Sequence, residues 1–385
     1  VEPEGMEFGV FGGTPMLFLL SERGSVVGVY DMTDPTAPEL TQLLPSGIGP
    51  EGALAIPERN LFVVANEEDL IEDGGVRAHV MIFELGEGEP AYPQLTSAGL
   101  NEDGMPVGWG AVSGMVAGEG DTVWFVNDSF YGMQPSIFEV DTSQTPARIT
   151  DVIGITREGA PAQLMDLEGI TLDGEGNFFV ASEGRLGRGI LHAIYHVTAE
   201  GEIAETIPFP NEVLANQRRW AAEGITRVGD TLWVAIQREF DDDPENHVKI
   251  LAYDLESEEW GAVLYPKGAP DTGWIGLSEI TAHGDHVYFI ERDNQIGDRA
   301  AVKKITRVSA DQMQPAPLDG EGLPVLEVED VRDLIPDLRQ LNGYVQDKVE
   351  GLAIFADGTA WVSTDNDGVD DHSGETLFFT IGTVD

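Results

Sequence analysis

Residues 168–182 read Glu168-Gly-Ile-Thr-Leu-Asp-Gly-Glu-Gly-Asn-Phe-Phe-Val-Ala-Ser182. Two apolar runs flank a turn rich in Gly and Asp, which predicts two antiparallel strands joined by a tight hairpin. Residues 223–236 repeat the phrase closely, and seven copies begin near residues 4, 51, 113, 168, 223, 278 and 350. Short strands that recur in this way are typical of a radial array. We therefore expect an all-β fold, a seven-bladed β-propeller of four-stranded antiparallel sheets that forms a single domain over residues 1–385.

The fourth repeat predicts the layout of one blade. Its strands are expected at residues 169–172, 178–182, 191–197 and 202–208. Two short inserts carry helical patterns, at residues 211–219 and at residues 329–341, where Pro336 interrupts the apolar stripe. The linkers between phrases vary while the inner strands do not, as expected when loops carry the variation.

The chain is extremely acidic, with 69 Asp and Glu against 21 Lys and Arg and a net charge of -48. Such a charge repels nucleic acid and anionic membrane surfaces. Two explanations stay open, namely solubility in a high-salt habitat and a surface that binds cations. Because 42% of the residues are hydrophobic, a packed core is expected rather than disorder.

The sequence also bears on the location of the protein. It contains no cysteine, which excludes a disulfide framework and a thiolate metal site. No apolar stretch approaches the ~20 residues needed to span a membrane. A cysteine-free, acidic and strand-rich chain favours an extracellular or periplasmic protein. Because the chain starts at Val1, we expect a processed or excised part of a larger parent with other domains.

The repeated acids of the phrase are the main candidate site. In a propeller the first strand of each blade lines the central channel, so acids that begin these strands converge on one channel mouth. Two unit charges ~4 Å apart repel by about 4 kcal/mol at an effective dielectric of ~20. Such a ring must bind metal, pair with arginines or hold protons at raised pKa. The acids are Glu4, Glu51, Glu168, Glu223 and Glu350, and the arginines are Arg23, Arg238 and Arg292.

The ligand chemistry favours calcium before magnesium, because oxygen ligands without cysteine select a hard ion. A second candidate is Asp365-Asn-Asp-Gly-Val-Asp-Asp371, which resembles the start of a calcium loop, although Thr376 stands where a bidentate Glu is expected. In the alternative interpretation each Glu accepts backbone N–H groups and an Arg from the next blade and locks the blades together. The sequence contains no G-x-S-x-G, P-loop or H-E-x-x-H motif, and we expect no organic cofactor.

Several phrases resemble the family named esterase-like activity of phytase, a phytase-like propeller domain, over about residues 108–382. They include Asp166-Leu-Glu-Gly-Ile-Thr171, Gly276-Leu-Ser-Glu-Ile-Thr281, Phe289-Ile-Glu-Arg-Asp293 and Lys348-Val-Glu-Gly-Leu-Ala353. The resemblance implies phosphoester hydrolysis, with the acids at 168, 223, 279, 291, 350, 365 and 367 as the functional set. The N-terminal segment is similar to the secreted choice-of-anchor I domain, on Val1-Glu-Pro-Glu-Gly5, Val29-Tyr-Asp-Met-Thr-Asp-Pro35 and Gly49-Pro-Glu-Gly52.

Two hypotheses of function follow. The first is a secreted, calcium-dependent phosphoesterase that hydrolyses small phosphorylated substrates at the acidic channel mouth. Its metal ligands would be Glu51, Glu168, Glu223, Glu279, Glu350, Asp365 and Asp367. Its catalytic residues would be Glu168, Glu223, Glu350, Arg238 and Arg292, and its substrate-binding residues Arg23, Arg185, Arg238 and Arg292. The second is a non-catalytic extracellular propeller that serves as a binding or assembly module in a salt-adapted organism.

Overall fold

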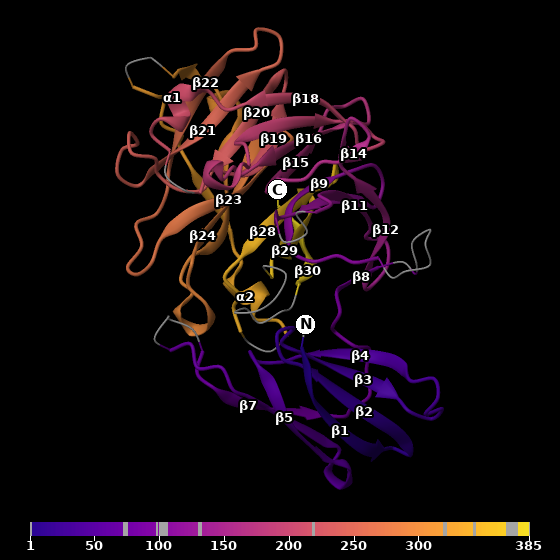
Figure 1. Cartoon of the computed structure of the whole chain (residues 1–385). Helices are drawn as coiled ribbons and strands as arrows, with labels where there is room; N and C mark the ends of the chain where they lie inside the picture. The colour runs from indigo at the N-terminus through magenta and orange to yellow at the C-terminus, as the bar shows by residue number, and fades with distance from the viewer. Residues whose placement is uncertain are drawn as a thin grey trace.

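The computed structural model describes residues 2–71, 76–97, 99, 107–129, 133–217, 220–318, 322–341, 344–366 and 376–384. Over these residues the chain forms seven sheets of three to five strands, with one further two-stranded ribbon (Figure 1). All strand pairs of the seven sheets are antiparallel except the pair formed by the short β8. No helix in the described part of the chain has the length and apolar character of a membrane span.

The first three sheets are built from the N-terminal part of the chain. The first contains β1 (Pro3–Phe11), β2 (Thr14–Ser21), β3 (Val26–Asp31) and β4 (Glu39–Pro45), and the second contains β5 (Pro50–Ile56), β6 (Leu61–Asn66) and β7 (His79–Glu84). The third contains β8 (Leu95–Ser97), β9 (Val112–Ala117), β10 (Thr122–Asn127), β11 (Ser136–Asp141) and β12 (Ala147–Gly154). The ribbon of β13 (Thr156–Arg157) and β14 (Ala160–Pro161) follows.

The other four sheets follow in chain order. The fourth contains β15 (Leu167–Leu172), β16 (Phe178–Ser182), β17 (Ala193–Val197) and β18 (Ile203–Pro208). The fifth contains β19 (Ala222–Val228), β20 (Thr231–Ile236), β21 (His247–Asp254), β22 (Trp260–Pro266) and β26 (Ala316–Pro317). The sixth contains β23 (Ile275–His283), β24 (His286–Asp293), β25 (Lys303–Ser309) and β27 (Glu329–Asp333), and the seventh contains β28 (Val349–Ile354), β29 (Thr359–Thr364) and β30 (Phe378–Thr383).

The helices are shorter than the sequence predicts. Helix α1 (Asn211–Leu214) and helix α2 (Ile335–Leu338) lie inside the two expected inserts. The prediction of a helix was wrong for residues 329–333, which form β27 against β25. Ion pairs across these strands join Lys304 to Asp330 at 2.7 Å and Arg307 to Glu329 at 3.2 Å. The charged residues at the start of this insert therefore lie on the edge strand of a sheet.

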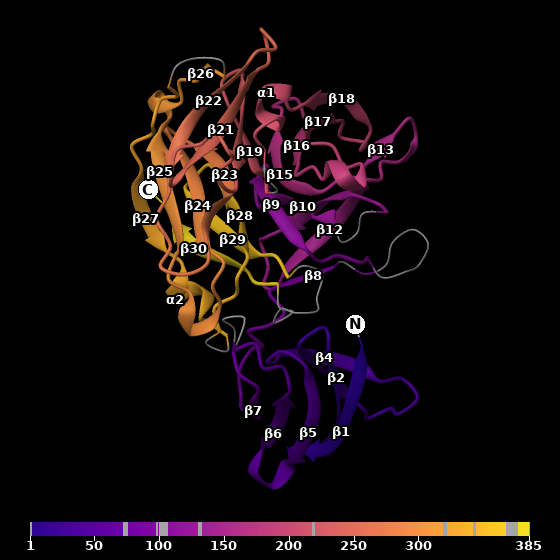
Figure 2. The same ribbon diagram turned by 60° about the vertical axis from the view of Figure 1, so that its left-hand side comes forward.

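The first strands of five sheets contact one another in a closed cycle, in the order β9, β15, β19, β23, β28 and back to β9. The first two sheets pack on each other through β1 and β5, and both views show them apart from the other five (Figures 1 and 2). The predicted all-β, propeller-like architecture is confirmed. The cycle of contacts among the described residues joins five sheets, and the other two sheets pack on each other. A single ring of seven blades therefore stays a prediction.

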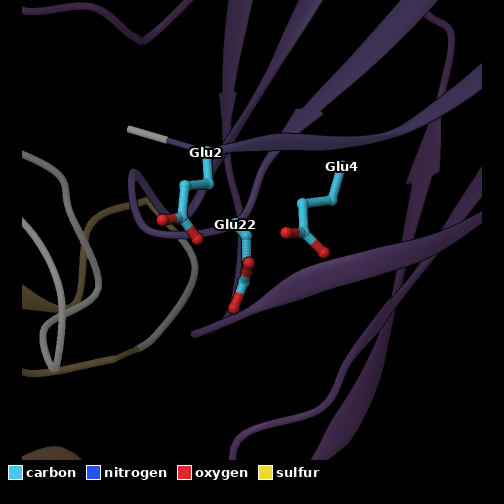
Figure 3. Close-up of side chains that lie close together, drawn as sticks. All are labelled: Glu2, Glu4 and Glu22. Atoms are coloured by element: carbon cyan, nitrogen blue, oxygen red, sulfur yellow. The ribbon is translucent and has the colours of Figure 1, made fainter.

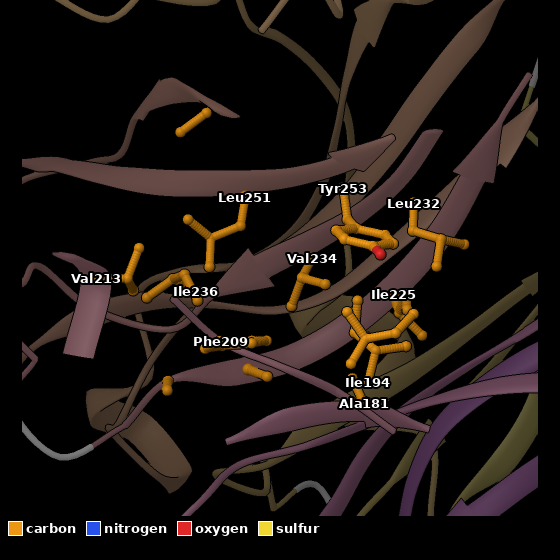
Figure 4. Packing of buried hydrophobic residues seen from close by; sticks show 14 of the residues in the cluster. Ala181, Ile194, Phe209, Val213, Ile225, Leu232, Val234, Ile236, Leu251 and Tyr253 are labelled. Carbon is orange, nitrogen blue, oxygen red and sulfur yellow. The ribbon is translucent and has the colours of Figure 1, made fainter. Parts of the chain in front are cut away.

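The hydrophobic core lies between neighbouring sheets. Figure 4 shows one such layer. Ile194 of the fourth sheet and Phe209, which follows its last strand, pack against Ile225, Val234 and Leu251 of the fifth sheet. Burying each large apolar side chain stabilises the fold by roughly 1.5–3 kcal/mol. The first two sheets have a core of their own, in which the rings of Phe18 and Phe62 stack with centroids 3.9 Å apart.

Candidate active site

A repeated β-bulge positions the phrase acids. In β15 the partners are Leu167 with Ser182 and Gly169 with Ala181, so that Glu168 between them has no partner on β16. The same register shift isolates Glu223 in β19 and Glu350 in β28. A bulge re-aims the side chain of its extra residue. The glycine that follows allows close approach, since a Cβ on Gly169 would lie 2.6 Å from the Cα of Gly224 in the next sheet.

An acid cluster is formed by Asp166, Glu168 and Glu183, which are all buried. One carboxylate oxygen from each lies within 4.8 Å of the others. Burial raises the pKa of Glu168 well above its ordinary value, and the nearby acids Glu223, Asp166, Glu350 and Asp128 raise it further. Burial and these like charges therefore favour a proton or a bound cation at Glu168.

Hydrogen bonds fix the orientation of the acid cluster. Ser113 of β9 donates its hydroxyl to Oε2 of Glu168 at 2.7 Å. The backbone N–H of Ser129 donates to Oδ1 of Asp166 at 3.0 Å, and that of Ala221 donates to Oε1 of Glu183 at 2.8 Å. Each acid is thus held by at least one hydrogen-bond donor from a neighbouring segment.

Glu223 lies next to this cluster with a separate set of partners. Its pKa is also raised well above the ordinary value, first by burial and then by Glu183 and Glu350, while Arg292 and a hydrogen bond from Gln237 act in the opposite direction. Gln237 is buried, and its Oε1 has no hydrogen-bond partner among the described residues. A buried acceptor without a partner is costly, so this amide oxygen is available to a bound ligand.

Glu350 is paired with a buried guanidinium. Arg292 of β24 donates from Nη2 to Oε1 of Glu350 at 2.5 Å and from Nη1 to Oδ1 of Asp347 at 3.0 Å. Burial by itself would lower the pKa of Arg292, but Asp347, Glu350 and Glu223 together raise it. The guanidinium therefore stays charged, and its Nε has no partner among the described residues.

Arg238 is held by aromatic rings. Its guanidinium carbon lies 3.3 Å from the ring centroid of Trp220 and 4.4 Å from that of Trp274. Arg292 approaches the same Trp274 ring at 5.1 Å. Burial lowers the pKa of Arg238 to about 10, while Glu223 and Glu183 oppose this shift. Arg238 therefore remains a cation at neutral pH, in a place fixed by cation–π contacts.

The carboxylate of Glu279 is bonded to backbone groups of two sheets. Glu279 takes the position of the phrase glycine in the sixth sheet, and its carboxylate accepts hydrogen bonds from the backbone of Met115 at 3.0 Å and of Ile280 at 2.9 Å. Burial raises its pKa well above the ordinary value, and these hydrogen bonds act against the shift. The contacts link the sixth sheet to the third across the ring, which is the locking role of the alternative interpretation.

Asp365 and Arg185 lie at the edge of this group. Asp365 follows β29 and accepts a hydrogen bond from Nζ of Lys348 at 3.0 Å, whereas Asp367 lies outside the described residues. Arg185 follows the second strand of the fourth sheet and acts on the pKa of Asp166 by its charge, as Lys348 does. Both cations thus offset the negative charge of the acid cluster.

The structure does not place three predicted residues with this group. Glu4 of β1 lies beside Glu2 and Glu22 in the first sheet, where one oxygen of each is within 4.8 Å of the others (Figure 3). Glu51 of β5 forms a similar group with Glu22 and Glu67. Arg23 is paired with Glu2 at 3.0 Å on the surface. These residues belong to the first two sheets, outside the cycle of five first strands.

Sequence reasoning did not select several residues of the site. Asp166 and Glu183 lie just before and just after residues 168–182, and not at the position that Glu168 shares with the other phrase acids. Gln237 and Trp274 belong to other parts of the chain. Lys303 is fully buried, with Nζ 3.0 Å from Oδ1 of Asp293. Two features of the sequence could have pointed to these residues. Lysine is rare in this chain, which singles out Lys303, and Asp166 lies two residues before the phrase acid Glu168.

The arrangement joins two kinds of binding group in one buried place. Carboxylates and an amide oxygen can coordinate a hard cation. Two guanidinium groups, Arg238 and Arg292, can bind an anion through directional N–H donors. Raised carboxyl pKa values allow a side chain to hold or transfer a proton near neutral pH. Such a site fits a ligand that carries negative charge and is bound together with a cation.

Comparisons with known proteins place the chain in a family. A comparison with curated proteins found no match. Among solved structures, hydrazine synthase from Kuenenia stuttgartiensis is 14% identical with a TM-score of 0.37, and covers 100% of this chain and 96% of its own. Glutaminyl cyclase from Myxococcus xanthus is 11% identical with a TM-score of 0.41, and covers 72% of this chain and 92% of its own. Likeness at this level says nothing of an activity.

The family model is more informative. The model described as "Phytase-like: Esterase-like activity of phytase" matches residues 107–368, which is more than half of the chain and includes the first two strands of each of the five sheets in the closed cycle. Asp166, Glu168, Glu183, Glu223 and Glu350 all lie inside the matched region. The chain therefore belongs to the phytase-like family.

Proposed function

We propose that this chain is a secreted, calcium-dependent phosphoesterase that hydrolyses small phosphorylated substrates at the buried acidic site. The observation that carries the proposal is the juxtaposition of Glu168 and Glu223, two buried acids of raised pKa, with the guanidinium groups of Arg238 and Arg292. Membership of the phytase-like family supports the same reaction class. The charge of -48 and the lack of cysteine support a location outside the cytoplasm in a salty medium.

The donor set fits a calcium ion. Asp166, Glu168 and Glu183 supply carboxylate oxygens within 4.8 Å of one another. Gln237, which hydrogen bonds to the neighbouring Glu223, has a buried Oε1 with no partner among the described residues. Oxygen-only donors of high negative charge select a hard cation. When bound, the ion would neutralise phosphate charge and polarise the phosphoryl group. Glu350 and Asp365, which already accept hydrogen bonds from Arg292 and Lys348, would supply negative charge around it.

The residues of the chain have separate roles in this proposal. Arg238 and Arg292 bind phosphoryl oxygens and stabilise charge that develops during transfer. Trp220 and Trp274 fix the position of the Arg238 guanidinium, so that little reorganisation is needed on binding. Glu223 can accept a proton from an attacking water, because its raised pKa brings it nearer to neutral pH. Glu168, as a ligand of the ion, would stay a carboxylate, and Glu223 can pass the proton that it takes from the water to the leaving oxygen.

The direct test is hydrolysis by the purified full chain. Phytate and a chromogenic phosphomonoester would be offered with calcium, after chelation, and after calcium is restored. We expect activity with calcium, loss on chelation and recovery on restoration. Glu223→Gln and Arg238→Met should abolish turnover, while the matched control Glu200→Gln, at an exposed turn, should not. Activity that survives chelation would contradict the role of the metal.

A second candidate function is a non-catalytic binding or assembly module. It is favoured by the contacts that use the ring acids structurally, namely Ser113 with Glu168, Met115 with Glu279 and Arg292 with Glu350. Under this alternative the acids lock neighbouring sheets together. Absence of hydrolysis of both substrates at saturating calcium, from a chain shown to be folded, would favour the module over the enzyme.

A further inference from the structure

The first two sheets carry apolar faces that none of the described residues covers. Of the thirteen large apolar side chains that are exposed among the described residues, nine lie before residue 86. In β1 the alternate residues Met6, Phe8 and Val10 are 69%, 54% and 49% exposed. In β7 Val80 and Ile82 are 60% and 65% exposed. Contiguous exposed apolar surface of this kind marks an interaction site.

Strand register shows that these residues form two continuous faces. Phe8 pairs with Leu17, and Met6 pairs with Leu19, so both rows point away from the second sheet. Leu54 pairs with Val63, and Val63 pairs with Ile82, so this row points away from the first sheet. We name these the first outer face (Met6, Phe8, Val10, Leu17, Leu19 and Leu40) and the second outer face (Leu54, Val63, Ala65, Val80 and Ile82).

The glycines that follow the phrase acids indicate that such a face packs against the first strand of a neighbouring sheet. A Cβ on Gly5 would lie 2.5 Å from the backbone oxygen of Glu51, so the first sheet presents this glycine to the second. Gly114 and Gly169 in the ring face the next first strand in the same way. Gly52 in the second sheet faces no other sheet in the part of the chain that the structure describes, where a Cβ would meet the side chain of Ala65 at 3.4 Å and nothing else within 4 Å. This position thus lacks the neighbouring strand that its equivalents have.

We propose that the first two sheets bind the same two sheets of a second copy of this chain. The second outer face of one copy covers the first outer face of the other, and the reverse contact forms at the same time. The interface continues the packing of the first sheet on the second, which the structure already contains. Two copies related by a twofold axis bring four sheets into a closed ring, which buries both apolar faces of both copies.

Charge determines the conditions under which the pairing forms. Each copy carries a net charge of -48, and acidic groups around Glu22 lie on the same two sheets. Repulsion between copies is therefore strong at low ionic strength and screened at high ionic strength. We expect the dimer in molar salt and dissociation on dilution into low salt.

The test is the mass of the full chain in solution, measured by light scattering during gel filtration in high salt. The expected mass is twice the 41.6 kDa of one chain. Phe8→Asn and Ile82→Asn should each return the chain to the mass of one copy, because both side chains are exposed and their loss leaves the fold intact. Val325→Asn is the matched control, since Val325 is 53% exposed on the other part of the chain, and it should keep the dimer.

The arrangement itself is tested by cross-linking, which is clean because the chain has no cysteine. A mixture of Phe8→Cys and Ile82→Cys proteins should give a covalent heterodimer with a short thiol–thiol cross-linker. Neither protein alone should do so, because the faces meet head to tail. A single-copy mass for the unmodified chain in high salt would overturn the proposal. Covalent dimers of Phe8→Cys alone would overturn the head-to-tail arrangement.

Discussion

Arg292 and Glu350 form a buried ion pair between the sixth and seventh sheets, with Nη2 and Oε1 2.5 Å apart and both side chains at most 3% exposed. The pair joins β24 to β28, a contact that helps to close the cycle of five first strands. The Arg292 guanidinium also acts on Glu223. Its charge lowers the pKa of Glu223, and the charge of Glu223 raises the pKa of Arg292. Arg292 and Glu350 thus contribute to closure of the ring and to the electrostatics of the site.

Removal of this arginine should destabilise the chain strongly. Arg292→Met leaves the buried Glu350 without its cation, while Asp347 keeps Lys303 at 3.7 Å, and breaking a buried pair costs about 3–5 kcal/mol. Urea unfolding monitored by tryptophan fluorescence measures this loss. Arg339→Met is the control, because Arg339 pairs with Asp298 at the surface, and it should change the midpoint little. Equal midpoints for the two variants would contradict the structural role of Arg292.

The buried acids should make stability depend on pH in a defined direction. The pKa values of Glu168 and Glu223 are raised above 4.5 in the folded chain. The folded state therefore binds protons that the unfolded state has released, and the contribution of these groups, complete below pH 4.5, is lost as pH rises through their folded pKa.

The measurement is the midpoint of thermal unfolding against pH in chelator, compared between the unmodified chain and Glu223→Gln. The difference between the two should change as pH rises above 4.5, with the unmodified chain losing stability relative to the variant. Calcium should remove most of this difference in slope, because a cation then replaces the proton. Parallel curves with and without calcium would count against a shared site for proton and cation.

The glycine of the fourth phrase should not tolerate a side chain. A Cβ on Gly169 would lie 2.6 Å from backbone atoms of Gly224 and Ile225, and backbone cannot move aside as a flexible side chain can. Gly169→Ala should therefore cost at least the ~1–3 kcal/mol typical of overpacking. Gly52→Ala is the matched control from the same phrase, since the only nearby atom is 3.4 Å away. We expect soluble, folded protein from the control and a large drop in the unfolding midpoint for Gly169→Ala.

A turn in the fourth phrase gives a further prediction. Asp173 accepts hydrogen bonds from the backbone of Glu175 at 2.7 Å and of Asn177 at 2.9 Å, and its Oδ2 lies 3.0 Å from Nε2 of His196. Burial would raise its pKa, but these hydrogen bonds outweigh burial and lower it. Asp173→Ala should lose about 0.5–1.5 kcal/mol of stability at neutral pH for each hydrogen bond removed, because these partly buried donors lose their acceptor.

The same bonds make this turn sensitive to acid. Because the folded pKa of Asp173 is lowered, its contribution is present at neutral pH and is lost as pH falls below its ordinary value of 3.8. The effect of Asp173→Ala should therefore shrink in acid. Asp34→Ala, in an exposed turn with a similar hydrogen bond, is the control and should change stability little at any pH.

The phrase was sufficient to predict the strands and the relation among three acids. Glu168, Glu223 and Glu350 occupy the same bulge in three sheets, and the charges of Glu223 and Glu350 both raise the pKa of Glu168, because equivalent positions of equivalent strands lie near one axis. The strand expected at residues 178–182 coincides with β16, since its pattern is purely local.

The phrase could not predict which sheets meet. Glu4 and Glu51 share the same bulge, yet they lie on the two sheets outside the cycle of five. That outcome depends on the contact of β28 with β9, which are separated by more than two hundred residues and carry no local signal of pairing. Gln237 and Trp274 were missed for the same reason, because only packing between sheets brings them to the acids.

Calcium binding measured by titration calorimetry on the full chain tests the account most directly. The unmodified chain, freed of metal beforehand, should bind calcium with release of protons, because Glu168 and Glu223 hold protons in its absence. Glu168→Gln with Glu223→Gln should abolish that binding, while Glu200→Gln should leave it unchanged. Calcium binding that is absent in the unmodified chain, or unaltered by the double substitution, would contradict the claim that these buried acids require a cation.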